Sequence, residues 1–317
     1  MFSRVLSPLT ASDGENLALY RWLHDDSLKE QALQSVKPRA VVLLVHGLGE
    51  HAGRYDAMAG ILRTWGFEVR AYDQRGHGQS GGKPGTLPVQ NALLSDLADV
   101  VDDVRAQCPG APLVLLGHSL GGLVASRFVA FQLRPIDALV LSSPALDAGL
   151  SLLQKTLLAV LPKFLPDATV SNGLNPQYLS HDARVVRAYQ ADRWVHNRIS
   201  PRLGKFIADA GPAVIAAAAS WNVPTLVLYA GDDKLVNPNG SRRFVDAAGR
   251  SPRVAPKTVT GVCFEGLYHE IFNELQSTPV FMELKTWLDA RFKPNRPLAQ
   301  GGIKSEVQHL KSTKVSR

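Results

Sequence analysis

The sequence predicts an α/β protein with a mostly parallel central sheet and a helical insert late in the chain. Apolar segments of strand length alternate with segments of helical spacing, which is typical of consecutive βαβ units. Several strand-like runs are apolar without interruption, as expected for strands that are buried on both faces. Between about residues 145 and 220 the alternation stops and only helical stretches follow. The sheet is therefore expected to resume after a helical cap.

The first part of the predicted core covers residues 1–144. Strands are predicted at 16–22, 39–45, 67–72, 113–116 and 137–142, and helices at 56–65, 91–106 and 123–131. The helix at 91–106 carries apolar residues at the spacing of an amphipathic helix. Residues 24–38 are polar and are predicted to form a loop.

The predicted cap, residues 145–220, lies between two strands of the sheet. Its helical stretches are 150–161, 184–194 and 203–219, and the first is unusually apolar, with Lys155 as its only charge. Such a helix could line an acyl pocket, dock on a membrane surface or pack on the core. The sequence leaves these three alternatives open.

The second part of the core, residues 221–292, contains predicted strands at 224–230 and 257–262 and a last helix at 279–291. A basic tail, residues 293–317, follows with six Lys or Arg residues and one Glu, and so carries most of the net charge of +7. Its composition predicts a flexible, solvated segment. Contact of the tail with anionic lipid or nucleic acid is the disfavoured alternative, and no nucleic-acid partner is predicted.

The composition is that of an ordinary globular protein, with 45% hydrophobic and 20% charged residues among 317. No run of eighteen apolar residues and no apolar signal core are found, so neither a membrane span nor secretion is predicted. The cysteines Cys108 and Cys263 are far apart and lack the spacing of a metal site. We therefore expect a cytoplasmic protein, with peripheral membrane contact through the cap as an alternative, and no metal or cofactor.

A candidate nucleophile lies in Gly117-His118-Ser119-Leu120-Gly121, a G-x-S-x-G pattern that joins a predicted strand to a predicted helix. A strand that runs straight into a helix forces a sharp turn, and glycines on both sides let its arms approach closely. Ser119 would stand at the apex with its hydroxyl exposed, and the N–H of Leu120 would face a developing oxyanion. The bare pattern is weak evidence, and its strand-to-helix context makes it a candidate nucleophile elbow.

A second glycine-rich segment, His46 to Tyr55, follows the predicted strand 39–45. Glycines after a strand let the backbone approach a ligand, and the N–H of Leu48 is placed to be the second oxyanion donor. His46 and His51 could be catalytic or metal ligands, but support of the loop by hydrogen bonds is the favoured role for His46. The glycine-dense loop 73–82 is interpreted as structural, because no helix follows it at once, as a phosphate-binding loop requires.

Three residues that could act together each follow a predicted strand: Ser119, Asp233 and His269. Loops at the carboxyl ends of parallel strands meet at one edge of a sheet. There a neutral imidazole can take the proton of the serine, and a carboxylate can hold that imidazole in the required tautomer. Asp232 is the rival acid.

The chain resembles the α/β-hydrolase superfamily from about Val5 to Arg291, and most closely its monoacylglycerol lipase and lysophospholipase branch, the serine aminopeptidase S33 group. The matching motifs are His46-Gly-Leu-Gly-Glu-His-Ala-Gly-Arg-Tyr55, Asp73-Gln-Arg-Gly-His-Gly78, Gly117-His-Ser-Leu-Gly-Gly122 and Tyr268-His269-Glu270. The resemblance implies Ser119 as nucleophile, His269 as base and Asp233 as acid. Asp233 is preferred to Asp232 because it stands three residues before apolar Val236, as in the family. One departure from the family pattern concerns Gly231. It precedes Asp233 by two residues, whereas in several relatives the glycine precedes the acid by three residues.

The resemblance implies a serine carboxylester hydrolase that cleaves single-chain lipid esters, monoacylglycerol or lysophospholipid, through an acyl-enzyme. The alternative is the same triad on another acyl substrate, as in a short-chain esterase, thioesterase, aminopeptidase or acyltransferase. A catalytically silent ligand-binding relative would lack a triad member, and all three are present. Dehalogenases and epoxide hydrolases are disfavoured because their elbow carries an aspartate. The expected partners are a small-molecule or lipid ester and, through the cap, a transient contact with a membrane surface.

Overall fold

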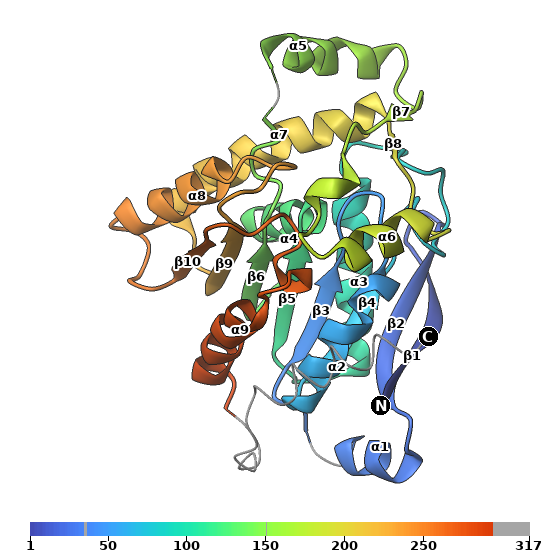
Figure 1. Cartoon of the computed structure of the whole chain (residues 1–317), viewed down its shortest axis with the longest axis vertical. Coiled ribbons are helices and arrows are strands. Elements are labelled where there is room, and N and C mark those ends of the chain that lie inside the picture. The colour runs from blue at the N-terminus through green and yellow to red at the C-terminus, as the bar shows by residue number, and fades with distance from the viewer. Residues whose placement is uncertain (35–36, 150, 294–317) are drawn as a thin grey trace.

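The computed structural model describes residues 1–34, 37–149 and 151–293 and contains a central sheet of eight strands in the order β1-β2-β4-β3-β5-β6-β9-β10 (Figure 1). The strands are β1 (Phe2–Thr10), β2 (Asn16–His24), β3 (Val41–Val45), β4 (Glu68–Tyr72), β5 (Leu113–His118), β6 (Ala138–Ser142), β9 (Thr225–Ala230) and β10 (Val259–Phe264). All neighbours from β4 to β10 pair in parallel, and β1 and β2 extend the sheet as an antiparallel hairpin. The predicted α/β class with a mostly parallel sheet is confirmed.

Helices cover both faces of the sheet, which explains why a central strand such as β3 is apolar throughout. The core helices are α1 (Ser27–Gln34), α2 (Asp56–Thr64), α3 (Ala92–Gln107), α4 (Leu120–Ala130), α8 (Asn239–Arg250) and α9 (Thr278–Arg291). In β3, Leu43 packs with α3 and α4 on one face, while Val42 and Leu44 pack with α2 and α9 on the other. Each successive side chain therefore enters one of two apolar cores.

The segment between β6 and β9 carries the helices α5 (Leu152–Val160), α6 (Ala183–Ala191) and α7 (Pro201–Ala217). These lie beyond the carboxyl ends of the strands, with α5 farthest from the sheet (Figure 1). A two-residue ribbon, β7 (Val170–Ser171) with β8 (Arg198–Ile199), joins this region, for which the sequence predicts only helices. The segment Pro201–Ser220 is long and apolar enough to cross a membrane by composition alone, but α7 within it packs against α4, α5 and α8.

The prediction of a loop for the polar segment 24–38 is wrong for residues 27–34, which form α1. It fails because α1 has little apolar periodicity and packs against β2 through few contacts. Helix α8 and strand β1 are further elements that the sequence did not predict. The basic tail lies outside the described residues from 294 onward.

Candidate active site

Ser119 is the residue at which β5 turns into α4, and its backbone is held in an unusual conformation. Its φ of 52° and ψ of −119° fall where residues other than glycine are rarely found. The amide of Ser119 donates to Ser142 O at 3.0 Å, and its carbonyl accepts from the amides of Leu123 and Ala145, both at 3.0 Å. The strained turn is therefore fixed by backbone contacts, which leave the half-buried serine side chain at the apex.

Two glycines make this turn sterically possible. A Cβ on Gly117 would lie 2.4 Å from the carbonyl oxygen of Gly121 across the turn. A Cβ on Gly121 would lie 2.0 Å from the carbonyl oxygen of Val45, the last residue of β3. The opposing atoms are backbone atoms of the sheet and turn, so they cannot move aside as a flexible side chain would.

Gly121→Ala is therefore expected to lower the free energy of unfolding by about 3 kcal/mol, through overpacking against backbone. Gly249→Ala is the matched control, because Gly249 lies in the last turn of α8 and, apart from its own helix backbone and chain neighbours, has no atom within 4 Å of the place that a Cβ would take. That substitution is expected to raise stability by about 0.5 kcal/mol. Urea denaturation of both variants checks the pair. Equal stabilities would show that the elbow tolerates a methyl group.

His269 and Asp233 come from loops after β10 and β9 and contact each other directly. His269 Nδ1 lies 2.7 Å from Asp233 Oδ2, and both side chains are buried. The other carboxylate oxygen, Oδ1, accepts the amides of Leu235 at 2.9 Å and Val236 at 3.0 Å. Asp232, the rival acid, is exposed to solvent. The structure thus brings Asp233, and not Asp232, to the histidine.

The contact changes the protonation behaviour of both residues. Burial by itself raises the pKa of Asp233, but His269 and the two amides outweigh it, so the pKa lies below its usual value. Burial by itself lowers the pKa of His269, but the Asp233 carboxylate outweighs it, so the pKa lies above 6.5. Because the ionised carboxylate accepts the Nδ1 proton, Nε2 remains as the basic nitrogen of the neutral ring.

Ser119, His269 and Leu48 line one cavity between the core and the cap. Apolar side chains form part of its wall, namely Leu174, Pro176, Leu179, Leu235 and Val236. Polar side chains form another part, among them Glu50, Arg54 and Tyr189. The two predicted oxyanion residues have different positions: Leu48 is half-buried at the cavity, and Leu120 is buried at the start of α4.

His46 supports the loop after β3, which is the role that the sequence favoured. Its Nε2 accepts the amide of Gln74 at 2.8 Å, and its Nδ1 lies 2.8 Å from Gly47 O. Burial lowers the pKa of His46, so the ring is neutral and both nitrogens are used in these contacts. No group of three metal-ligating side chains is found in the described part of the chain.

The loop 73–82 also supports this region. Asp73 is fully buried and accepts hydrogen bonds, each 2.8 Å long, from Ala52 N, Gln79 N and the hydroxyl of Tyr20. Ala52 begins the short helical turn η1 (Ala52–Tyr55), so Asp73 joins the loop after β4 to the loop after β3. These contacts are those of a structural loop.

The cap is tied to the same loop after β3. The amide of His196 donates to Gly49 O at 2.9 Å, and His51 Nε2 lies 2.8 Å from Asp192 at the end of α6. A Cβ on Gly49 would lie 2.2 Å from His196 O, so only glycine allows this approach. His51 therefore makes a contact with the cap, and no local pattern in the sequence indicates its partner.

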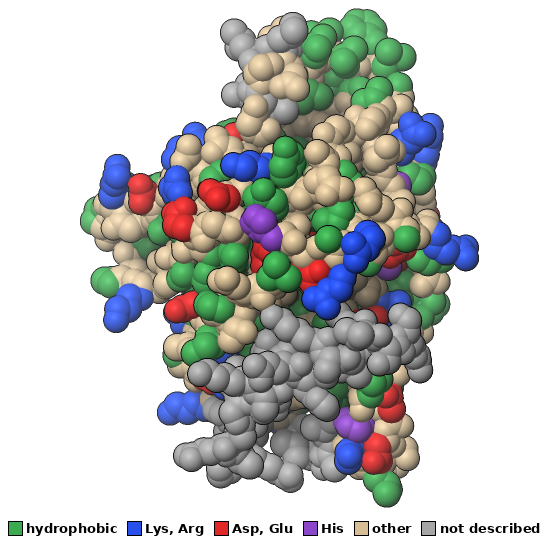
Figure 2. Space-filling model, in the orientation of Figure 1, with side chains coloured by type: hydrophobic (Ala, Val, Ile, Leu, Met, Phe, Trp, Pro, Cys, Tyr) green, Lys and Arg blue, Asp and Glu red, His purple; other side chains and the backbone are tan. Residues whose placement is uncertain are grey.

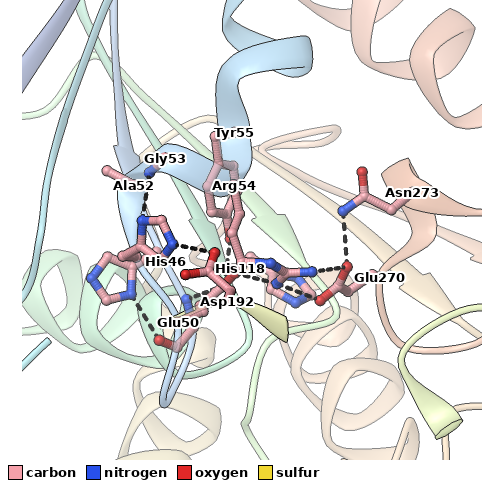
Figure 3. A network of polar contacts seen from close by, with 12 residues as sticks. His46, Glu50, Ala52, Gly53, Arg54, Tyr55, His118, Asp192, Glu270 and Asn273 are labelled. Atoms are coloured by element: carbon pink, nitrogen blue, oxygen red, sulfur yellow. Dashed lines mark hydrogen bonds and ion pairs between the residues drawn. The ribbon is translucent and has the colours of Figure 1, made fainter. Parts of the chain in front are cut away.

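Sequence reasoning missed a buried ionic network beside the histidine, formed by Glu50, Arg54 and Glu270 (Figure 3). Glu50 and Arg54 are four residues apart in the motif after β3, which is a usable signal for a pair. Glu270 is 216 residues from Arg54, so no local pattern shows that contact. His118 also lies close, with its ring centroid 4.7 Å from that of His269. Burial, with a smaller effect of His269, lowers the pKa of His118 to about 4.

Comparison with known proteins shows one consistent family. The model of the family described as "Serine aminopeptidase, S33" matches residues 36–276. A monoacylglycerol lipase from Mycolicibacterium smegmatis is 36% identical over 254 residues, which are 79% of this chain and 88% of that protein. An uncharacterized abhydrolase domain-containing protein from Dictyostelium discoideum is 32% identical over 294 residues. That match covers 91% of this chain but only 29% of the longer relative.

Solved structures agree with the similarity to this family. The crystal structure of a monoacylglycerol lipase from Paleococcus ferrophilus is 34% identical, with a TM-score of 0.71, and the match covers 80% of this chain and 96% of that one. A monoglyceride lipase from Saccharomyces cerevisiae, solved in complex with a substrate analog, has a TM-score of 0.78 at 21% identity and shows the shared fold. Its match covers 92% of this chain and 96% of that one.

Proposed function

The chain belongs to the serine aminopeptidase S33 family of α/β-hydrolases and is a hydrolase of the carboxylesterase and lipase class, and from this premise we propose that it cleaves single-chain lipid esters, monoacylglycerol or lysophospholipid, through an acyl-enzyme. The observation that carries the proposal is the buried contact between His269 and Asp233 at the cavity that Ser119 lines. Relatives named monoacylglycerol lipase support the substrate class.

In the proposed reaction, Ser119 Oγ attacks the ester carbonyl while His269 Nε2 accepts the hydroxyl proton. Asp233 keeps the Nδ1 proton in place and stabilises the imidazolium. The amides of Leu48 and Leu120 donate to the oxyanion of the tetrahedral intermediate. His269 then gives its proton to the departing alcohol oxygen, and the acyl group remains on Ser119. A water molecule repeats the sequence, which releases the fatty acid and restores the serine.

The wall of the cavity has an apolar part and a polar part, which supports the proposal of an amphiphilic substrate. Leu174 and Leu179 from the cap and Val236 from the core offer apolar contacts to an acyl chain. The hydroxyl of Tyr189 offers a hydrogen-bonding group on the same cavity, and the mutually paired Glu50 and Arg54 make that part of the wall polar. A single-chain ester with a polar alcohol has one part suited to each wall.

We also propose a transient contact of the cap with a membrane surface. Exposed apolar side chains of α5 and the turn after it, Leu157, Val160, Phe164 and Leu165, gather on the part of the cap farthest from the sheet (Figure 2). Exposed apolar groups of this kind favour the boundary of a lipid layer.

Both cysteines are free thiols, which supports the proposed cytoplasmic location.

The substrate proposal is tested with purified protein and a panel of p-nitrophenyl esters of increasing chain length, monoacylglycerol and lysophosphatidylcholine. Preference for monoacylglycerol or lysophosphatidylcholine over short esters is the expected result. Hydrolysis of short esters alone would retain the esterase and contradict the lipid substrate. Hydrolysis of no ester in the panel would favour a thioester, peptide or acyl-transfer reaction instead.

The pH dependence of the reaction follows from the raised pKa of His269. The base must be neutral, so kcat/KM is expected to fall as the pH drops through that pKa. Because Asp233 raises the pKa above 6.5, the fall begins at a higher pH than an isolated histidine would give. A pH profile of kcat/KM with a soluble ester checks this. An acid limb centred below the ordinary histidine value would contradict the assignment of His269 and Asp233.

A further inference from the structure

Arg54 joins two loops that both reach the active site (Figure 3). Its Nη1 donates to Glu50 Oε2 at 2.6 Å and to Glu270 Oε1 at 2.7 Å, and its Nη2 donates to Glu270 Oε2 at 2.9 Å. All three side chains are almost completely removed from solvent. A guanidinium can hold two carboxylates in this way because its donors lie in one rigid plane.

At one end, Glu50 shapes the loop that carries a proposed oxyanion donor. Its Oε1 accepts the amide of Gly47 at 2.6 Å and the hydroxyl of Tyr55 at 2.8 Å. Gly47 is the residue directly before Leu48. The carboxylate therefore sets the direction of the backbone at the point where the Leu48 amide must face the substrate.

At the other end, Glu270 is the residue directly after His269. Its side chain accepts Asn273 Nδ2 at 2.8 Å in addition to Arg54, and its amide donates to Leu179 O of the cap at 2.8 Å. The position of Glu270 therefore sets where the backbone of His269 lies. Arg54 connects this turn to the loop of Leu48.

The network also contributes charge beside the base. The groups that face His269 are Asp233, His118, Glu50 and Glu270, with Arg54 between the two glutamates. Burial lowers the pKa of His269, Asp233 raises it most, and Glu270 and Glu50 raise it further. Burial also opposes the charge of Arg54, but the two carboxylates outweigh burial, so the pKa of Arg54 lies above its ordinary value.

We propose that Arg54 is a positioning residue for ester hydrolysis: by holding Glu50 and Glu270 together, it fixes the Leu48 amide and the His269 ring relative to each other. The assignment rests on the proposed function, because it presumes those two groups act on the substrate. The residue acts through the two carboxylates to which its guanidinium donates its hydrogen bonds.

Arg54→Lys tests the assignment, because lysine keeps the charge but cannot hold both carboxylates in one plane. We expect kcat to fall about tenfold to a hundredfold with KM nearly unchanged, since small displacements of reacting groups carry penalties of that order. Arg63→Lys is the matched control. Arg63 is also buried and bridges two carboxylates, those of Glu30 and Glu68, at the far end of the fold. It is expected to lose stability without a change in kcat.

Glu270→Gln supplies a readout that a purely structural role would not move. Glutamine keeps the shape of the side chain but removes a negative charge near His269, so the acid limb of kcat/KM is expected to move to lower pH. Arg63→Lys is expected to leave the limb in place. An unchanged acid limb in Glu270→Gln would overturn the proposed link between the network and the base.

A fluorophosphonate probe separates the two ways in which the proposal can fail. If the wild-type protein is not labelled, the proposed serine mechanism fails, and the role of Arg54 with it. If the wild type is labelled and Arg54→Lys has wild-type kcat, only the positioning role is overturned. Equal loss of kcat in Arg54→Lys and Arg63→Lys would likewise assign Arg54 to stability alone. Loss confined to Arg54→Lys supports the proposal.

Discussion

Ser119→Ala is expected to lower ester hydrolysis by about four to six orders of magnitude, which is the loss found when other serine hydrolases lose their nucleophile. The hydroxyl is removed, so no acyl-enzyme can form and His269 has no proton to accept. Stability should be nearly unchanged, because the structural contacts of Ser119 are made by its backbone. Alanine also adopts the same positive φ at a similar cost to serine.

The matched control is Ser143→Ala. Ser143 is a buried serine that also has a positive φ, of 40°, and follows β6, the strand next to β5. Its hydroxyl has no hydrogen-bond partner among the described residues. Ester hydrolysis by this variant should stay near the wild-type rate. The prediction is checked by parallel ester-hydrolysis assays and unfolding curves of the wild type, Ser119→Ala and Ser143→Ala. Substantial turnover by Ser119→Ala would exclude Ser119 as the nucleophile.

Asp233→Asn is expected to lower kcat by about 10⁴, as the equivalent change does in serine proteases. An amide can donate to His269 Nδ1, and this would favour the wrong tautomer and leave Nε2 protonated. It would also remove the charge that raises the pKa of His269. The change is therefore directed at the chemical step and not at substrate binding.

Asp232→Asn is the control for this prediction, because Asp232 is the adjacent residue, of the same type, and exposed. Its kcat should stay within about twofold of wild type, since exposed surface substitutions have small effects. Steady-state kinetics of both variants with one soluble ester provides the comparison. A larger loss in Asp232→Asn would move the catalytic acid by one residue.

The sequence predicted the parallel core well because burial on both faces imposes a simple pattern. Strand β3 is apolar throughout and β5 is apolar from Leu113 to Leu116, and few other structures produce runs of that length and composition. Elements at the periphery lack this constraint. Strand β1 is largely exposed and left no strong pattern, whereas α8 is amphipathic but polar overall and buries few side chains, among them Phe244 and Ala248.

The candidate site was predictable where chemistry requires particular residues at fixed spacing. Gly117 and Gly121 mark the elbow because backbone atoms occupy the space of their missing side chains. The choice between Asp232 and Asp233 is different, since it depends on burial and on contact with His269. Burial and contact with His269 cannot be read from the local sequence. The preference for Asp233 came from the resemblance to the family, in which the acid stands three residues before an apolar position.

The bond between the His196 amide and Gly49 O also offers a way to measure how often the cap separates from the core. Any movement that separates His196 from Gly49 breaks this bond and removes one of the contacts that hold the loop of Leu48, the proposed oxyanion donor. Because the same event exposes the His196 amide to solvent, the rate of deuterium exchange at that amide is expected to report how often the bond to Gly49 O breaks.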